Sequence, residues 1–112
     1  MLTEGIQVNA HHERSLMATY LSLLNWTDQG IRTVKDSPKR LESTRKALKK
    51  LGGEVKAFYM LQGQYDGVLI FDIPNDEALT KFLLTTGTAG NVRTTTLRAF
   101  TEEEFMKYIA AL

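Results

Sequence analysis

Few side chains in this sequence could do chemistry, because it contains no cysteine and two histidines, both near its start. A disulfide, a thiolate nucleophile and a thiolate metal site are therefore excluded. His11 and His12 are adjacent, which suits a single metal ion poorly, so we expect no metal site. No phosphate-binding glycine motif or nucleophile elbow is present, and we expect no cofactor. Any general base in the rest of the chain must be Asp, Glu, Tyr or Lys.

Tyr65 and Asp66 are the candidate catalytic residues, and they follow Gly63 between two strand-like segments. In one interpretation both lie at the mouth of a pocket, where Asp66 accepts a proton or binds a ligand hydroxyl. The other interpretation is structural: Gly63 adopts a positive φ, Tyr65 packs, and Asp66 satisfies amides of the turn. The sequence leaves both open.

A second group of polar residues could bind a small anionic or aromatic ligand. Asn25 and Trp26 end the first strand-like segment, and Arg93 lies at the start of the last. If these strands pair antiparallel, the three residues meet at one end of the sheet. Arg93 could donate two hydrogen bonds to a carboxylate or phosphate, or could pair with a nearby aspartate instead. Thr94 and Thr96 could line the same cavity, or could be there only as strand formers.

The composition is that of a single globular domain. Of the 112 residues, 43% are hydrophobic and 24% are charged, which is too apolar for a disordered chain. A net charge of +1 gives no overall attraction to nucleic acid or an anionic membrane. The basic segment from Lys39 to Lys50 is a local exception, more typical of a solvated helix face than of a nucleic-acid site. The absence of cysteine and of any membrane-length apolar segment leads us to expect a cytoplasmic protein.

Four segments rich in β-branched, aromatic or alternating apolar residues predict strands. They cover residues 18–26, 54–61, 65–73 and 91–99. The short connection at residues 62–64 predicts an antiparallel hairpin.

Helix signals lie between and after these strands. Ser37 as the N-cap residue and Pro38 as the first helical residue predict the start of the first helix, and Gly52 predicts its end. A second helix begins near Asp76, with acidic residues in its first turn. Thr101 and Glu104 form a capping box that predicts a final helix.

The order β-α-β-β-α-β predicts a ferredoxin-like α+β fold with a four-stranded antiparallel sheet and an extra C-terminal helix. Right-handed crossovers put both long helices on one face of the sheet. We expect Leu21 and Leu23 to point to these helices, and Tyr20, Leu69 and Phe71 to lie on the other face. That face would expose large apolar groups, so we expect a second copy to cover it in a homodimer or higher homo-oligomer. The C-terminal helix is the alternative cover.

Four blocks of the sequence from Met17 onward form a recognisable pattern: Gly63-Gln64-Tyr65-Asp66, Leu24–Ile31, Lys35–Arg40 and Gly90–Thr96. Together they resemble the GYD-domain family of small bacterial and archaeal proteins. The resemblance implies a ferredoxin-like fold of the dimeric α/β-barrel type, and it implies no established catalytic residues. It covers residues 17–112, so we interpret residues 1–16 as a flexible N-terminal extension.

Three functional hypotheses follow. The first is a non-catalytic oligomeric module that binds a small ligand between subunits. The second is a cofactor-free isomerase or monooxygenase that uses Tyr65 or Asp66, a hypothesis that rests on fold kinship alone. The third is nucleic-acid binding through the basic first helix.

Overall fold

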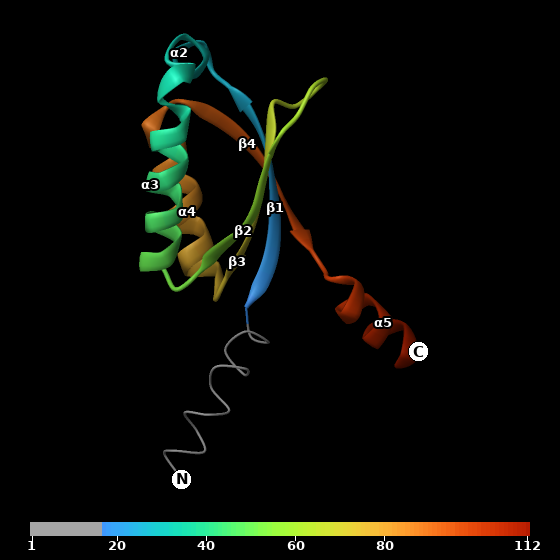
Figure 1. Cartoon of the computed structure of the whole chain (residues 1–112). Coiled ribbons are helices and arrows are strands. Elements are labelled where there is room, and N and C mark those ends of the chain that lie inside the picture. The colour runs from blue at the N-terminus through green and yellow to red at the C-terminus, as the bar shows by residue number, and fades with distance from the viewer. Residues whose placement is uncertain (1–16) are drawn as a thin grey trace.

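A computed structural model describes residues 17–112, in which helices pack on one face of a single sheet (Figure 1). The predicted extension at residues 1–16 lies outside the described residues. The elements, in chain order, are β1 (Ala18–Trp26), α2 (Asp28–Arg32), the short 3-10 helix η1 (Val34–Asp36), α3 (Ser37–Lys50), β2 (Glu54–Met60), β3 (Gly67–Ile73), α4 (Asp76–Ala89), β4 (Val92–Ala99) and α5 (Glu102–Ala110).

The sheet order is β2-β3-β1-β4, and every neighbouring pair of strands is antiparallel. The crossover that contains α3 joins β1 to β2, and the crossover that contains α4 joins β3 to β4. Both long helices lie on the same face of the sheet (Figure 1). The predicted ferredoxin-like fold is confirmed.

The hydrophobic core lies between the sheet and the helices α3 and α4. Phe71 and Ile73 of β3 and Leu48 of α3 are fully buried. Phe82 of α4 meets the Phe71 ring edge-on, with 5.1 Å between centroids. Burying side chains of this size contributes about 1.5–3 kcal/mol each, so this layer supplies most of the apolar stabilisation.

The predicted orientation of β1 was wrong, because its polar-looking residues face the helices. Tyr20 packs against the core and stacks on Phe71, with 6.0 Å between ring centroids. Ser22 is buried, and its hydroxyl lies 2.5 Å from the Thr96 hydroxyl, so neither oxygen is left unpaired. Leu69, which is paired with Ser22, belongs to the same core and not to the opposite face.

Predicted and observed element ends differ by a few residues. The helix α3 starts at Ser37, one residue before the predicted first residue Pro38, and Asp36 is its N-cap in place of Ser37 because η1 leads directly into it. Gly52, at φ +86°, follows the end of α3 as predicted. The β2–β3 connection runs from residue 61 to 66, longer than the predicted turn, and the capping box that starts α5 is confirmed.

The edge strand β2 is irregular. Its pairing with β3 shifts register between Val55 and Ala57, which is a β-bulge at Lys56. The Lys56 ammonium lies 3.7 Å from Glu54 and 3.8 Å from Asp72. The bulge therefore places a charged side chain on the outermost strand.

Candidate binding surface

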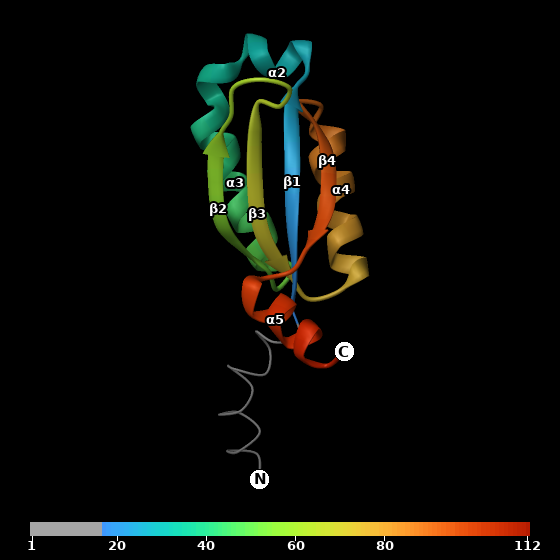
Figure 2. The same cartoon turned by 90° about the vertical axis from the view of Figure 1, so that its right-hand side faces the viewer.

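The face of the sheet opposite the helices has no cover within the described chain (Figure 2). Directly paired residues share a face, and Leu21 pairs with both Ile70 and Leu97. Leu23 pairs with Val68, and this row continues to the edge strand. We call this surface the open face, and its apolar members are Leu21, Leu23, Tyr59, Val68, Ile70 and Leu97.

The open face is apolar at its centre and polar at its two ends. Its central strands β1 and β3 carry the partly exposed Leu21 and Ile70, and its edge strands β2 and β4 carry Tyr59 and Leu97, which are 60% and 50% exposed. At one end the Thr19 hydroxyl donates to an Asp72 carboxylate oxygen at 2.7 Å. At the other end Asn25 pairs with Arg93. An apolar centre with a polar rim is the usual anatomy of a protein–protein interface.

The helix α5 does not cover the open face, so the intramolecular alternative is wrong. It has no buried residue, and it projects beyond one end of the sheet (Figures 1 and 2). Its large apolar side chains are all more than half exposed. The radius of gyration is 16.2 Å, whereas a compact domain of this length has about 13 Å. These exposed residues of α5 are Phe105, Met106, Tyr108 and Ile109, and Leu112, beyond the end of the helix, is 98% exposed.

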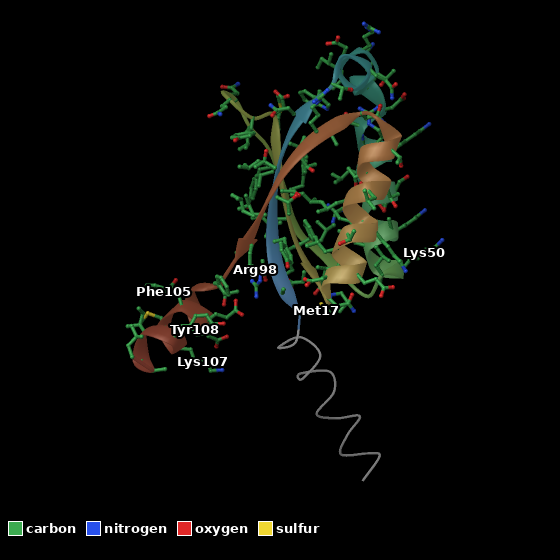
Figure 3. All side chains as sticks on the ribbon, turned by 180° about the vertical axis from the view of Figure 1, so that it is seen from behind. Met17, Lys50, Arg98, Phe105, Lys107 and Tyr108 are labelled. Carbon is green, nitrogen blue, oxygen red and sulfur yellow. The ribbon has the colours of Figure 1, made fainter. Side chains whose placement is uncertain are left out.

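A cation–aromatic stack holds the start of α5 against the end of the sheet. The Arg98 guanidinium lies 4.2 Å from the centroid of the Phe100 ring and 5.6 Å from that of Tyr20. Phe100 in turn meets Tyr108 edge-on at 5.6 Å. Arg98 also donates to the carbonyl of Thr19 at 3.2 Å. Because Tyr20 packs on the core, α5 is tied to the domain while its apolar side chains stay exposed (Figure 3).

The catalytic candidate Asp66 is engaged in holding strands together. Its carboxylate accepts a hydrogen bond from the Trp26 backbone N–H at 2.9 Å. Its own N–H donates to the Leu24 carbonyl, and its carbonyl accepts from the Leu61 N–H, both at 2.8 Å. Tyr65 beside it is half-buried. Asp66 thus links β1 to the β2–β3 connection, as a structural residue would.

Two of the predicted ligand residues meet on the open face. Asn25 and Arg93 are direct partners in the β1–β4 ladder, as antiparallel pairing predicted. The Asn25 side chain donates to the Gln64 carbonyl at 2.9 Å. Arg93 is exposed, and no salt bridge joins it to Asp28 or Asp36 within residues 17–112.

The other predicted ligand residues lie on the helix side of the sheet. The Thr96 hydroxyl is hydrogen-bonded to the Ser22 hydroxyl. Thr94 is paired with Leu24 and is exposed, and by alternation Trp26 shares this side. The structure therefore does not gather the predicted residues in one cavity: two are on the open face and three are on the covered face.

The segment after β1, from Thr27 to Gly30, is hydrogen-bonded to the segment before β4, Gly90 and Asn91. The Thr27 hydroxyl donates to the Gly90 carbonyl at 2.7 Å, and the Thr27 N–H donates to the Asn91 carbonyl at 3.1 Å. The Gln29 side chain donates to the Asn91 side-chain oxygen at 3.0 Å. Gly30 is buried so close to Asn91 that an added Cβ would lie 1.9 Å from its carbonyl oxygen. The sequence blocks at residues 24–31 and 90–96 thus hold α2 against the start of β4.

The basic helix α3 presents its cations to solvent. Arg40 is the exception, because it donates to the carbonyls of Gly30 and Thr33 and so ties α2 to α3. Arg45 and Lys49 border a half-open depression of about 200 Å³ between α3 and β2. Its other lining residues are Gly53, Glu54 and Val55.

Within residues 17–112 no three His, Cys, Asp or Glu side chains are grouped closely enough to hold a metal ion. In that same part of the chain, no helix is both long enough and apolar enough to cross a bilayer.

Sequence reasoning missed the open-face residues Leu21, Leu23 and Tyr59. A signal was present in β3, where Val68, Leu69, Ile70 and Phe71 are apolar without alternation. A strand that is apolar on both sides is typical of a sheet with both faces covered. In a chain whose two crossover helices can cover only one face, that pattern indicates a second covering element.

The strand order, with both long helices on one side of the sheet and the open face on the other, defines a ferredoxin-like α+β domain. The chain belongs to the GYD-domain family, whose model matches residues 20–109. It is 30% identical over 84 residues to the "Glutamine synthetase and cystathionine beta-lyase binding protein" of Thermus thermophilus, a match that spans 74% of this chain and 88% of that protein.

A solved structure shares the fold. The crystal structure of MtbAldR superposes with a TM-score of 0.61 at 14% identity, over 90% of this chain and 70% of that one. The leucine response regulatory protein LrpA of Mycobacterium tuberculosis gives a TM-score of 0.49 at 19% identity, over 75% of this chain. The match spans 51% of LrpA, about half its length.

Proposed function

We propose that this protein is a non-catalytic binding module that works as an assembly of at least two copies, with the open face of each copy covered by another. The observation that carries the proposal is the apolar, polar-rimmed sheet face that neither α3, α4 nor α5 covers. The name of the Thermus relative, a binding protein, supports binding rather than catalysis as the role of the family.

The energetics favour a covered open face. Tyr59 and Leu97 are half or more exposed, and their neighbours Leu21, Leu23 and Ile70 are each partly exposed. Removing roughly 100 Å² of apolar surface per large side chain contributes about 2.5 kcal/mol at 25 cal/mol per Å². Burying two or three such side chains would therefore contribute a free energy that is a large share of the 5–15 kcal/mol typical of a domain's stability.

A small anionic ligand at the end of the open face is a second candidate function, favoured by the position of Arg93. Its guanidinium is exposed beside Asn25, and it has no acidic partner in the described part of the chain. A planar guanidinium can donate two parallel hydrogen bonds to a carboxylate or phosphate. Covering the open face with a second copy would partly desolvate this site and strengthen such a contact.

The self-association is tested by sedimentation velocity and light scattering over a wide range of protein concentration. Leu97→Glu puts a charge on the open face beside Leu21. It is expected to weaken association by at least about thirtyfold, because burying an unpaired carboxylate is costly. Leu84→Glu is the matched control: Leu84 is 65% exposed, but it lies on α4 in the helical layer. The control should associate like the unaltered protein.

Two results would contradict the proposal. One is an unaltered protein that stays monomeric at about millimolar concentration, the weakest range of specific association. The other is equal association of the Leu97→Glu and Leu84→Glu variants, which would show that the open face is not the contact surface.

A further inference from the structure

The C-terminal segment formed by α5 and the two residues after it carries an apolar stripe that is more than half exposed. Phe105 and Ile109 follow the i, i+4 spacing that places side chains on one side of a helix, and Leu112, two residues past the end of α5, continues that spacing in sequence. Their exposed fractions are 55%, 51% and 98%. Lys107 lies on the same helix between them in sequence but on a different side. We call Phe105, Ile109 and Leu112 the arm stripe, and a stripe with this spacing is typical of a helix that docks on an apolar surface.

The arm stripe is displayed in a set direction. The stack of Tyr20, Arg98 and Phe100 fastens the start of α5 to the end of the sheet, and the Phe100–Tyr108 contact extends this anchor along the helix. The helix therefore stands clear of its own open face (Figures 1 and 3). An ordered arm loses less conformational entropy on binding than a free segment would.

We propose that α5 is an exchanged arm: the arm stripe of one copy packs on the open face of a second copy, and the second copy returns the contact. This inference rests on the proposed self-association and names the element that covers the open face. Each chain carries both an exposed arm stripe and an exposed open face. If two copies exchange arms, both surfaces of both copies are buried within one dimer. Such a pair has two-fold symmetry and closes on itself, which is the commonest arrangement of homo-oligomers.

The available area matches that of a stable dimer. Large side chains bury 150–250 Å², so each half-exposed one on the arm or the open face offers roughly 100 Å². The arm stripe with Met106 gives roughly 400 Å² per copy, and the open face gives a similar area. Two copies together would bury about 1,600 Å², the standard size of a specific protein–protein interface.

Mixing two variants tests the exchange. Ile109→Glu disrupts the arm stripe and keeps the open face, whereas Leu97→Glu disrupts the open face and keeps the arm. Because α5 has no buried residue, Ile109→Glu should leave the domain folded, which circular dichroism checks. Lys107→Glu is the control on another side of the same helix.

Ile109→Glu alone is expected to self-associate at least about tenfold more weakly than the unaltered chain, and Leu97→Glu alone at least about thirtyfold more weakly, as above. A mixture of Ile109→Glu and Leu97→Glu, each carrying a different fluorophore, should form mixed pairs more tightly than either variant pairs with itself. The reason is that the intact arm of the Leu97→Glu copy meets the intact face of the Ile109→Glu copy. Lys107→Glu should associate like the unaltered chain.

The outcomes separate the two proposals. If Ile109→Glu associates normally while Leu97→Glu does not, the exchanged arm is wrong and the open face remains the contact surface. If the mixture pairs no better than its components, the arm does not dock on the partner's open face and the inference is overturned. If both variants associate normally, the exchanged arm and the proposed contact through the open face both fail.

Discussion

Replacing Asp66 tests whether the residue that looks most catalytic is structural. In Asp66→Ala the carboxylate that accepts the Trp26 N–H is lost, and a half-buried backbone donor loses its partner. The two backbone hydrogen bonds of Asp66, with Leu24 and Leu61, do not depend on its side chain and should survive. The change therefore removes one link between β1 and the β2–β3 connection and leaves the others.

The expected loss of stability is about 2 kcal/mol, because a hydrogen bond to a charged group contributes about 1.5–3 kcal/mol. For a domain of this size 1 kcal/mol shifts the melting temperature by about 4–8 °C, so Asp66→Ala should melt about 10 °C lower. Asp66→Asn keeps an oxygen acceptor without the charge and should lose about half as much.

Urea unfolding at one fixed protein concentration measures these differences, since self-association also stabilises the folded chain. Gln64→Ala is the matched control: the Gln64 carbonyl, and not its side chain, accepts the Asn25 hydrogen bond, so this variant should unfold like the unaltered protein. A free catalytic carboxylate would behave differently, because removing strained functional groups is usually neutral or stabilising. An unchanged or raised unfolding midpoint in Asp66→Ala would refute the structural role.

Two further predictions concern the same end of the sheet. Gly30→Ala should lower the free energy of unfolding by more than about 2 kcal/mol, because its Cβ would lie 1.9 Å from the Asn91 carbonyl oxygen. The control Gly87→Ala, whose Cβ would lie in open space within α4, should raise the free energy of unfolding by up to about 1 kcal/mol. Equal unfolding midpoints of the two variants would contradict this. Arg93→Gln should weaken the binding of inorganic phosphate or benzoate, measured by calorimetry, by at least about tenfold relative to Lys81→Gln. If neither anion binds the unaltered protein at about millimolar concentration, the small-ligand proposal is wrong.

The order of elements could be predicted because independent local signals agreed. Gly52 and Gly90 both adopt the positive φ that ends a helix, and Thr101 with Glu104 forms the predicted capping box. Element ends were less accurate because they depend on contacts across the sheet. The β2–β3 connection is longer than predicted since Asp66 bonds to β1, 42 residues earlier in the chain at Leu24.

The face of each strand could not be predicted, and this limited the candidate site. A shift of one position exchanges the two faces of a strand, and β1 offers large side chains on both. Tyr20 and Ser22 look like solvent-facing residues, but an aromatic ring with a stacking partner and a hydroxyl with a paired hydroxyl are stable in a core. Antiparallel pairing did bring Asn25 to Arg93 as predicted, because that contact depends on topology and not on which way the strands face.

The bulge at Lys56 bears on how large an assembly can grow. An outer strand with a straight row of free amides invites strand after strand to add along the sheet, which ends in fibrils. At β2 the shifted register between Val55 and Ala57 interrupts this row of amides. Another strand could pair there only if the Lys56 ammonium lost its hydration. Growth by edge addition is thus discouraged at the β2 border of the sheet, whereas contact between open faces needs no free strand edge.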